Sequence, residues 1–114
     1  MISIIATALL SMAAMKGDPL DDARKSFNNC MIEVHNTAVD EKASPRAFIQ
    51  TSDAACPMER AAYKEILVKS ERSFGSSQTE AEKFASEEIQ MIVDSIVTSF
   101  NENIESGAKL TPEK

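Results

Sequence analysis

The sequence predicts an all-α protein in which a helical hairpin and a long third helix form an antiparallel three-helix bundle. The 114 residues include only three glycines and four prolines, a composition that favours helices over sheets. Three segments repeat apolar residues at steps of three and four, the spacing of one helix face. The only two cysteines, Cys30 and Cys56, lie where one disulfide can staple the first two helices, after an N-terminal signal segment.

The chain opens with a segment typical of a secretory signal peptide. Residues 2–15 are uncharged and mostly apolar, and they are too few for a membrane span, which needs ~20 residues. Ser11 and Ala13 place small side chains three and one positions before a cleavage site, so residues 1–13 are the predicted signal peptide. No lysine or arginine precedes the apolar run, which leaves two alternatives open: a true start further upstream, or a buried N-terminal helix.

The first helix is expected to begin at Asp18, at the start of a single helical domain over residues 18–107. Aspartate is a good N-cap, and Pro19 suits the first helical position because its missing N–H is not needed there. Polar residues, Asn29 and Asn36 among them, fall largely on other faces of this helix. Its apolar stripe fades near Lys42 and consists of Leu20, Ala23, Phe27, Cys30, Met31, Val34 and Ala38.

The second helix is expected to begin at Ser44-Pro45, which repeats the signal of a cap followed by proline. Pro57 is costly inside a regular helix, by ~3 kcal/mol, because it deletes a hydrogen bond and clashes with the preceding turn. We therefore expect a kink, or two helices that meet near Ala55–Cys56. The second piece should end at Ser73–Gly75. Its inward candidates are Phe48, Ala55, Cys56, Ala62, Tyr63, Ile66 and Leu67.

The third helix is the clearest periodic segment. Ser77-Gln78-Thr79-Glu80 matches a capping box, in which the serine and glutamate side chains bond to each other's backbone. Gly107 and Pro112 end the helix and leave residues 108–114 as a flexible tail. The apolar stripe consists of Ala81, Phe84, Ala85, Ile89, Ile92, Val93, Ile96, Phe100 and Ile104.

The spacing of the cysteines predicts that they pair. A tight turn at Ala43–Ser44 puts Cys30 and Cys56 each 13 residues from Ala43, on arms roughly 20 Å long, so the two sulfurs lie level across the hairpin. Closing a loop of this size contributes about 3.5 kcal/mol in the chain-entropy model. A lasting disulfide needs an oxidising compartment. The signal-like segment and the cysteine pair therefore agree on a periplasmic or secreted protein.

No motif indicates catalysis, a metal or a cofactor. The cysteines lack the C-x-x-C spacing of redox sites, and His35 is the sole histidine, which is expected on an exposed polar face. Two alternatives stay open as a haem or metal carrier. Cys30 and Cys56 could hold a metal with His35, or His35 could bind haem iron together with Met31, Met58 or Met91.

Acidic residues concentrate in the third helix. The chain has a formal net charge of −6, and seven acidic residues with one lysine between Gln78 and Ser106 account for that charge. Nucleic-acid binding is disfavoured, because it needs a basic face. The acidic face is a candidate site for a protein partner with a basic surface, and its residues are Glu80, Glu87, Glu88 and Asp94.

These features favour an exported, non-catalytic binding or envelope-structural module, without a membrane span once the signal is removed. One alternative is a chaperone-like or inhibitor module that binds a basic protein through the acidic third helix. The others are a haem or metal carrier, and a membrane-tethered protein whose first segment is retained.

The layout resembles that of small exported helical proteins of Gram-negative bacteria, which have a short signal, one cysteine in each of the first two helices and an acidic third helix. Three stretches carry the resemblance across most of the mature chain: FNNCM, CPMERAAYKE and SERSFGSSQTEAEKFASEEI. Because such proteins have no assigned activity, the resemblance implies a compartment and a fold, and no mechanism.

Overall fold

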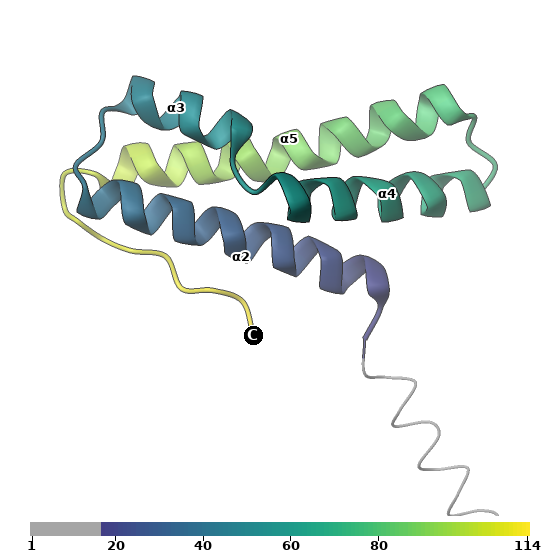
Figure 1. Ribbon diagram of the computed structural model, residues 1–114, viewed down its shortest axis with the longest axis horizontal. Helices are drawn as coiled ribbons and strands as arrows, with labels where there is room; N and C mark the ends of the chain where they lie inside the picture. The colour runs from purple at the N-terminus through teal and green to yellow at the C-terminus, as the bar shows by residue number, and fades with distance from the viewer. Residues whose placement is uncertain (1–16) are drawn as a thin grey trace, which may run out of the picture.

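The computed structural model describes residues 17–114, so the signal peptide predicted for residues 1–13 lies outside it. Four α-helices follow in the described part of the chain: α2 (Pro19–Asp40), α3 (Pro45–Ala54), α4 (Pro57–Ser73) and α5 (Gln78–Asn103). In Figure 1, α2 and α4 run beside the long α5, and the short α3 lies against the C-terminal half of α5. None of these helices is long and apolar enough to cross a membrane.

The second predicted helix is two helices, α3 and α4, which meet at Ala55–Cys56 as one of the two expectations had it, so the described chain has four helices where three were predicted. Pro57 cannot donate a backbone hydrogen bond, and Cys56 takes a left-handed conformation with φ 56° and ψ 52° between α3 and α4. The guanidinium of Arg60 then binds the carbonyls that the break leaves free, with 2.8 Å to the oxygen of Ser52 and 3.1 Å to that of Ala55. This tertiary cap stabilises a full break where a kink was the other expectation.

The predicted caps set the other helix ends. The Asp18 carboxylate accepts a hydrogen bond from the backbone N–H of Leu20 at 3.1 Å, and the Ser44 hydroxyl accepts one from Ala47 at 3.1 Å. Ser77 and Glu80 form the capping box, with reciprocal bonds of 3.1 and 2.9 Å. These contacts confirm the expected starts of α2, α3 and α5.

The core fills the space between the helices with apolar side chains from all four. Phe48 of α3 stacks on Phe100 of α5 with ring centroids 4.2 Å apart, and Phe27 of α2 meets Tyr63 of α4 at 6.1 Å. Burying one such side chain contributes about 1.5–3 kcal/mol. These contacts tie α3 to α5 and α2 to α4, and they fix which faces of α2 and α5 remain at the surface.

Residues 108–114, which the sequence predicts to be a flexible tail, contain no helix or strand. They run back along α2 from the end of α5 (Figure 1). Leu110 packs against the core, and Lys109 forms an ion pair of 2.7 Å with Asp40. The C-terminal segment therefore has a defined path in the structure, on the polar face of α2.

Candidate functional site

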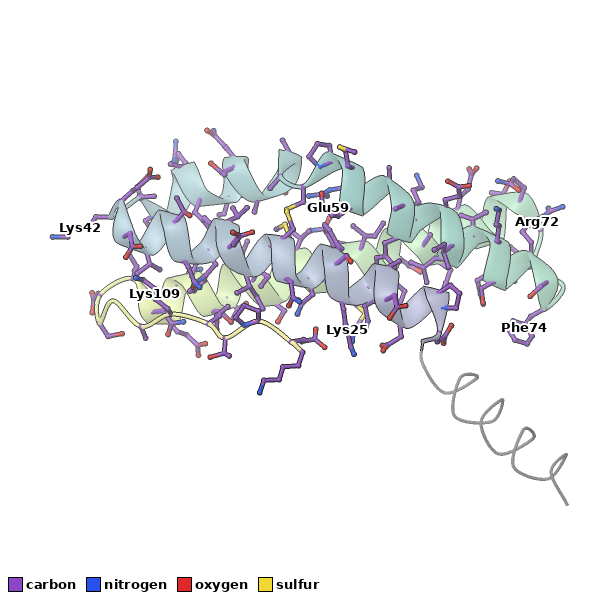
Figure 2. All side chains as sticks on the ribbon, turned by 60° about the horizontal axis from the view of Figure 1, so that its bottom comes forward. Lys25, Lys42, Glu59, Arg72, Phe74 and Lys109 are labelled. Atoms are coloured by element: carbon purple, nitrogen blue, oxygen red, sulfur yellow. A yellow bond between two sulfur atoms is a disulfide. The ribbon has the colours of Figure 1, made fainter. Side chains whose placement is uncertain are left out.

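The two cysteines form the predicted disulfide. Cys30 lies in the middle of α2 and Cys56 lies at the break between α3 and α4, with their Cα atoms 6.2 Å apart. Figure 2 shows the bond next to Glu59. The two cysteines therefore lie level across the hairpin, as their equal distances from the turn predicted. The bond ties the first helix to the α3–α4 break.

One group of three metal-ligating side chains occurs among the described residues. One ligand atom each from Cys30, Cys56 and Glu59 lies within 4.8 Å of the others. Zinc and other soft metals bind thiolates, and these two sulfurs are bonded to each other. When the disulfide is formed, the Glu59 carboxylate is therefore the one side chain of this group that remains available to bind a metal. His35 does not belong to it.

The expectation that His35 is exposed was wrong, because its side chain is completely buried. The imidazole lies edge-on to Phe48 and Phe100, with centroid distances of 6.5 and 6.1 Å. The sequence did contain the signal, since His35 stands four residues after Met31 and three before Ala38, on the apolar stripe.

Both ring nitrogens of His35 are hydrogen-bonded. The amide of Asn36 donates to the carbonyl of Leu110 at 3.0 Å, so its oxygen faces Nδ1 of His35 at 2.8 Å as an acceptor. Nδ1 therefore carries the proton, and Nε2 accepts from the amide of Asn103 at 3.3 Å. A metal or haem iron would have to displace one of these amides. Of the candidate methionines, Met31 is buried, whereas Met58 and Met91 are 82% and 65% exposed.

Three of the four predicted acidic residues share one exposed face of α5. Glu80, Glu87 and Asp94 are spaced by seven residues, and Phe84 and Met91 alternate with them at steps of four and three. Phe84 is 36% exposed and Met91 65% exposed. We call these five residues the outer stripe. None of the ion pairs formed within residues 17–114 involves them.

Glu88, the fourth predicted acidic residue, is half-buried and lies beside the outer stripe, one turn after Phe84. It lines a cavity of about 340 Å³ between α2, α4 and α5, together with Tyr63 and Arg24. Burial raises the pKa of the Tyr63 hydroxyl, and the charge of Glu88 raises it further. Phe84 of the outer stripe lines the same cavity, so Glu88 borders the stripe and is less exposed than Glu87.

A shallow groove separates α2 from α3, because α3 packs mainly on α5. Its volume is about 420 Å³, its floor includes Val34, Ala38 and Phe48, and Glu33 and Glu41 lie at its edge. Cys30 also lines it. The groove is open and apolar, with acidic side chains only along the α2 rim.

Sequence reasoning missed the residues of α2 that hold the C-terminal segment. Asn29 and Asn36, expected only to be polar-face residues, each bond to both the N–H and the carbonyl of one tail residue. Arg24 and Asn28 bind the Glu113 carboxylate. The partners lie 74–89 residues apart in sequence, so no local pattern indicates them.

None of the protein-family models, curated proteins or solved structures compared with this chain matches it. The structure itself shows a small all-helical protein with one disulfide. The resemblance placed one cysteine in each of the first two helices, whereas Cys56 lies at the break between α3 and α4. The compartment that it implied stays a proposal.

Proposed function

We propose that this protein is an exported, non-catalytic binding module whose outer stripe on α5 binds a basic partner protein. The alternation of acidic and apolar side chains on one exposed helix face carries this proposal. Glu80, Glu87 and Asp94 supply negative charge along about four turns of the helix, and Phe84 and Met91 supply apolar contact area between them.

The complementary partner is an amphipathic helix that carries lysine or arginine beside apolar residues. Phe84 and Met91 are seven residues apart, about 10.5 Å along the axis, which matches the repeat of a second helix packed alongside. Apolar contact supplies affinity, whereas the carboxylates favour a basic partner over an acidic one and speed its approach. A helix that engages others through regularly spaced anchors is a recurring recognition mode.

Two features support export. Residues 2–15 have the length and apolar character of a signal peptide core, and the chain forms a disulfide, which persists in oxidising compartments. Intact mass of protein isolated from its native host tests both features. We expect the mass of a chain cleaved after Ala13, lowered by the two hydrogens lost in the disulfide. Full-length protein with free thiols would contradict export.

The binding proposal is tested with a synthetic amphipathic helix of leucine and lysine, titrated into the full-length protein at low and at moderate salt. We expect the double variant Glu87→Gln, Asp94→Asn to bind more weakly, because it removes two charges of the stripe. Met91→Gln should weaken binding at both salt concentrations, because it removes apolar contact. Screening should reduce the effect of the charge variant at higher salt.

The matched control is the double variant Asp53→Asn, Glu65→Gln. It changes the net charge equally, but its residues are exposed on α3 and α4, away from the outer stripe. Equal weakening in the control would show that net charge alone attracts the peptide. Unchanged binding in Met91→Gln would show that the stripe makes no apolar contact. Either result would overturn the proposal.

The haem or metal carrier has weaker support. Both nitrogens of His35 are occupied by amide groups, and the sulfurs of Cys30 and Cys56 are joined. A carrier would need these groups to rearrange before any ligand bond forms. The outer stripe needs no rearrangement to meet a partner, because its side chains are already at the surface.

A further inference from the structure

Two asparagines of α2 hold the C-terminal segment by its backbone. The Asn36 amide donates to the carbonyl of Leu110 at 3.0 Å and accepts from its N–H at 2.9 Å. The Asn29 amide donates to the carbonyl of Glu113 at 2.9 Å and accepts from its N–H at 2.8 Å. We call this pair of residues the asparagine ladder. Each amide makes the two bonds that a neighbouring β-strand would make.

The spacing of the ladder matches an extended chain. Asn29 and Asn36 are seven residues apart on a helix, which is about 10.5 Å of rise. Leu110 and Glu113 are three residues apart, and three extended residues span about 10 Å. The two residues between them include Pro112, which has no N–H to donate. The asparagine ladder therefore recognises the main chain of the bound segment. It places little restriction on the side chains at the two intervening positions.

One side chain adds chemical specificity. The Glu113 carboxylate accepts two bonds of 2.8 Å from the guanidinium of Arg24 and one of 2.6 Å from the amide of Asn28. A guanidinium fork of this kind selects a carboxylate. Leu110 supplies the one apolar contact with the core. The ligand that fits is thus an extended segment with an apolar residue and a carboxylate three residues later.

The ladder is built into the core on its inner side. The oxygen of Asn36 that accepts from Leu110 also accepts from Nδ1 of buried His35, which is held in turn by Asn103 of α5. These bonds restrain the Asn36 amide from the core side, in addition to its two bonds with the tail. A preset amide costs less ordering when a peptide binds.

The C-terminal segment is held at the surface of α2, with Leu110 packed against the core. Its hydrogen bonds to other elements are all made with α2, and none of its residues is fully buried. It joins α5 through a turn at Gly107, whose φ of +78° suits glycine. The segment therefore occupies the site as a tethered ligand does.

We propose that the asparagine ladder, with Arg24 and Asn28, is a binding site for an extended peptide of another protein, and that the protein's own C-terminal segment occupies this site in cis. The peptide has an apolar residue followed three positions later by glutamate or aspartate. It pairs its backbone with the ladder, as in strand addition, and its carboxylate with Arg24.

The test uses the full-length protein and a fluorescent peptide with the sequence GAKLTPEK, which is that of residues 107–114. Glu113→Lys removes the carboxylate from the tethered tail, so the site becomes free more often. We expect this variant to bind the peptide at least about tenfold more tightly than the wild type, because the tail no longer competes. The same peptide with lysine in place of glutamate should not bind.

Two further variants locate the binding. Adding Asn29→Ala to Glu113→Lys should abolish peptide binding, whereas adding Met91→Gln should leave it unchanged, since Met91 lies on the outer stripe. Binding to α2 is thus separable from the proposed function of α5. Leu110→Ala offers a second way to loosen the tail if Glu113→Lys does not fold cooperatively. Folded variants that fail to bind would show that the tail contact is only structural, and binding that survives Asn29→Ala would place the peptide elsewhere. Either result would overturn the proposal.

Discussion

Removal of the disulfide tests how much of the fold depends on one covalent link. The double variant Cys30→Ala, Cys56→Ala opens a loop with a sequence separation of 26 residues. In the chain-entropy model, closing that loop removes freedom from the unfolded chain equivalent to about 3.5 kcal/mol at 25 °C. A small domain has a free energy of unfolding of about 5–15 kcal/mol, so the loss is a large share of the total.

The loss is measured by thermal and denaturant unfolding, followed by circular dichroism. For a domain of roughly this size, each kcal/mol lowers the melting temperature by about 4–8 °C, so we expect a decrease of roughly 14–28 °C. A dithiol reductant should lower the melting temperature of the wild type to a similar value and leave the variant unchanged. A difference below about 1 kcal/mol would refute the argument that the link restricts the unfolded chain.

Three further predictions follow from single residues. His35→Ala should lower the free energy of unfolding by about 3 kcal/mol in denaturant titrations, because it leaves a cavity and two unpaired amides; a loss under about 1 kcal/mol would contradict its buried role. Glu113→Gln should lower the free energy of unfolding by about 1 kcal/mol at neutral pH. This value is small because the ion pair with Arg24 is partly exposed to solvent. Because that pair lowers the pKa of Glu113 in the folded state, its contribution is present above the ordinary value of 4.5 and is lost as the pH falls through the lowered pKa. Melting curves of wild type and variant should therefore converge in acid, and a constant gap would argue against the ion pair. Gly75→Ala should cost about 1 kcal/mol by the same measurement, because φ is +103° there while a methyl group would meet no neighbour; an unchanged stability would show that the turn relaxes.

Local sequence signals determine where the helices start. Asp18-Pro19, Ser44-Pro45 and the capping box at Ser77 each satisfy free N–H groups with a side chain two or three residues earlier. Such contacts depend only on neighbours in the chain. They can therefore be predicted without knowledge of the fold, and the cysteine pairing follows from counting the residues between the turn at Ala43–Ser44 and each cysteine.

The number of helices could not be predicted from local sequence signals alone, because it depends on contacts between helices. Pro57 disfavours a continuous helix, yet a kink and a break were both compatible with the sequence. The outcome depends on whether the carbonyls before the proline find other donors. Arg60 supplies them, and its guanidinium also lies over the ring of Phe27, 5.3 Å from the centroid. The position of Phe27 on a different helix could not be read from the local pattern.

His35 was expected at the surface because histidine is often exposed, and its position on the apolar stripe was given less weight. Histidine is often at the surface, but the stripe formed with Met31 and Ala38 places position 35 inside. A buried imidazole needs two hydrogen-bond partners. Asn36 is adjacent in sequence, but Asn103 is 68 residues away. The second hydrogen-bond partner that allows histidine to be buried could therefore not be predicted from the sequence.

The asparagine ladder shows how a polar face can carry information that composition does not reveal. Read alone, Asn29 and Asn36 are ordinary surface residues of an amphipathic helix. Their spacing of seven acquires meaning only beside an extended segment whose paired residues are three apart, since both intervals span about 10 Å. Pro112 lies between the paired residues, where no bond of the ladder needs a backbone N–H, and any peptide proposed to compete with the tail would have to match the same spacing.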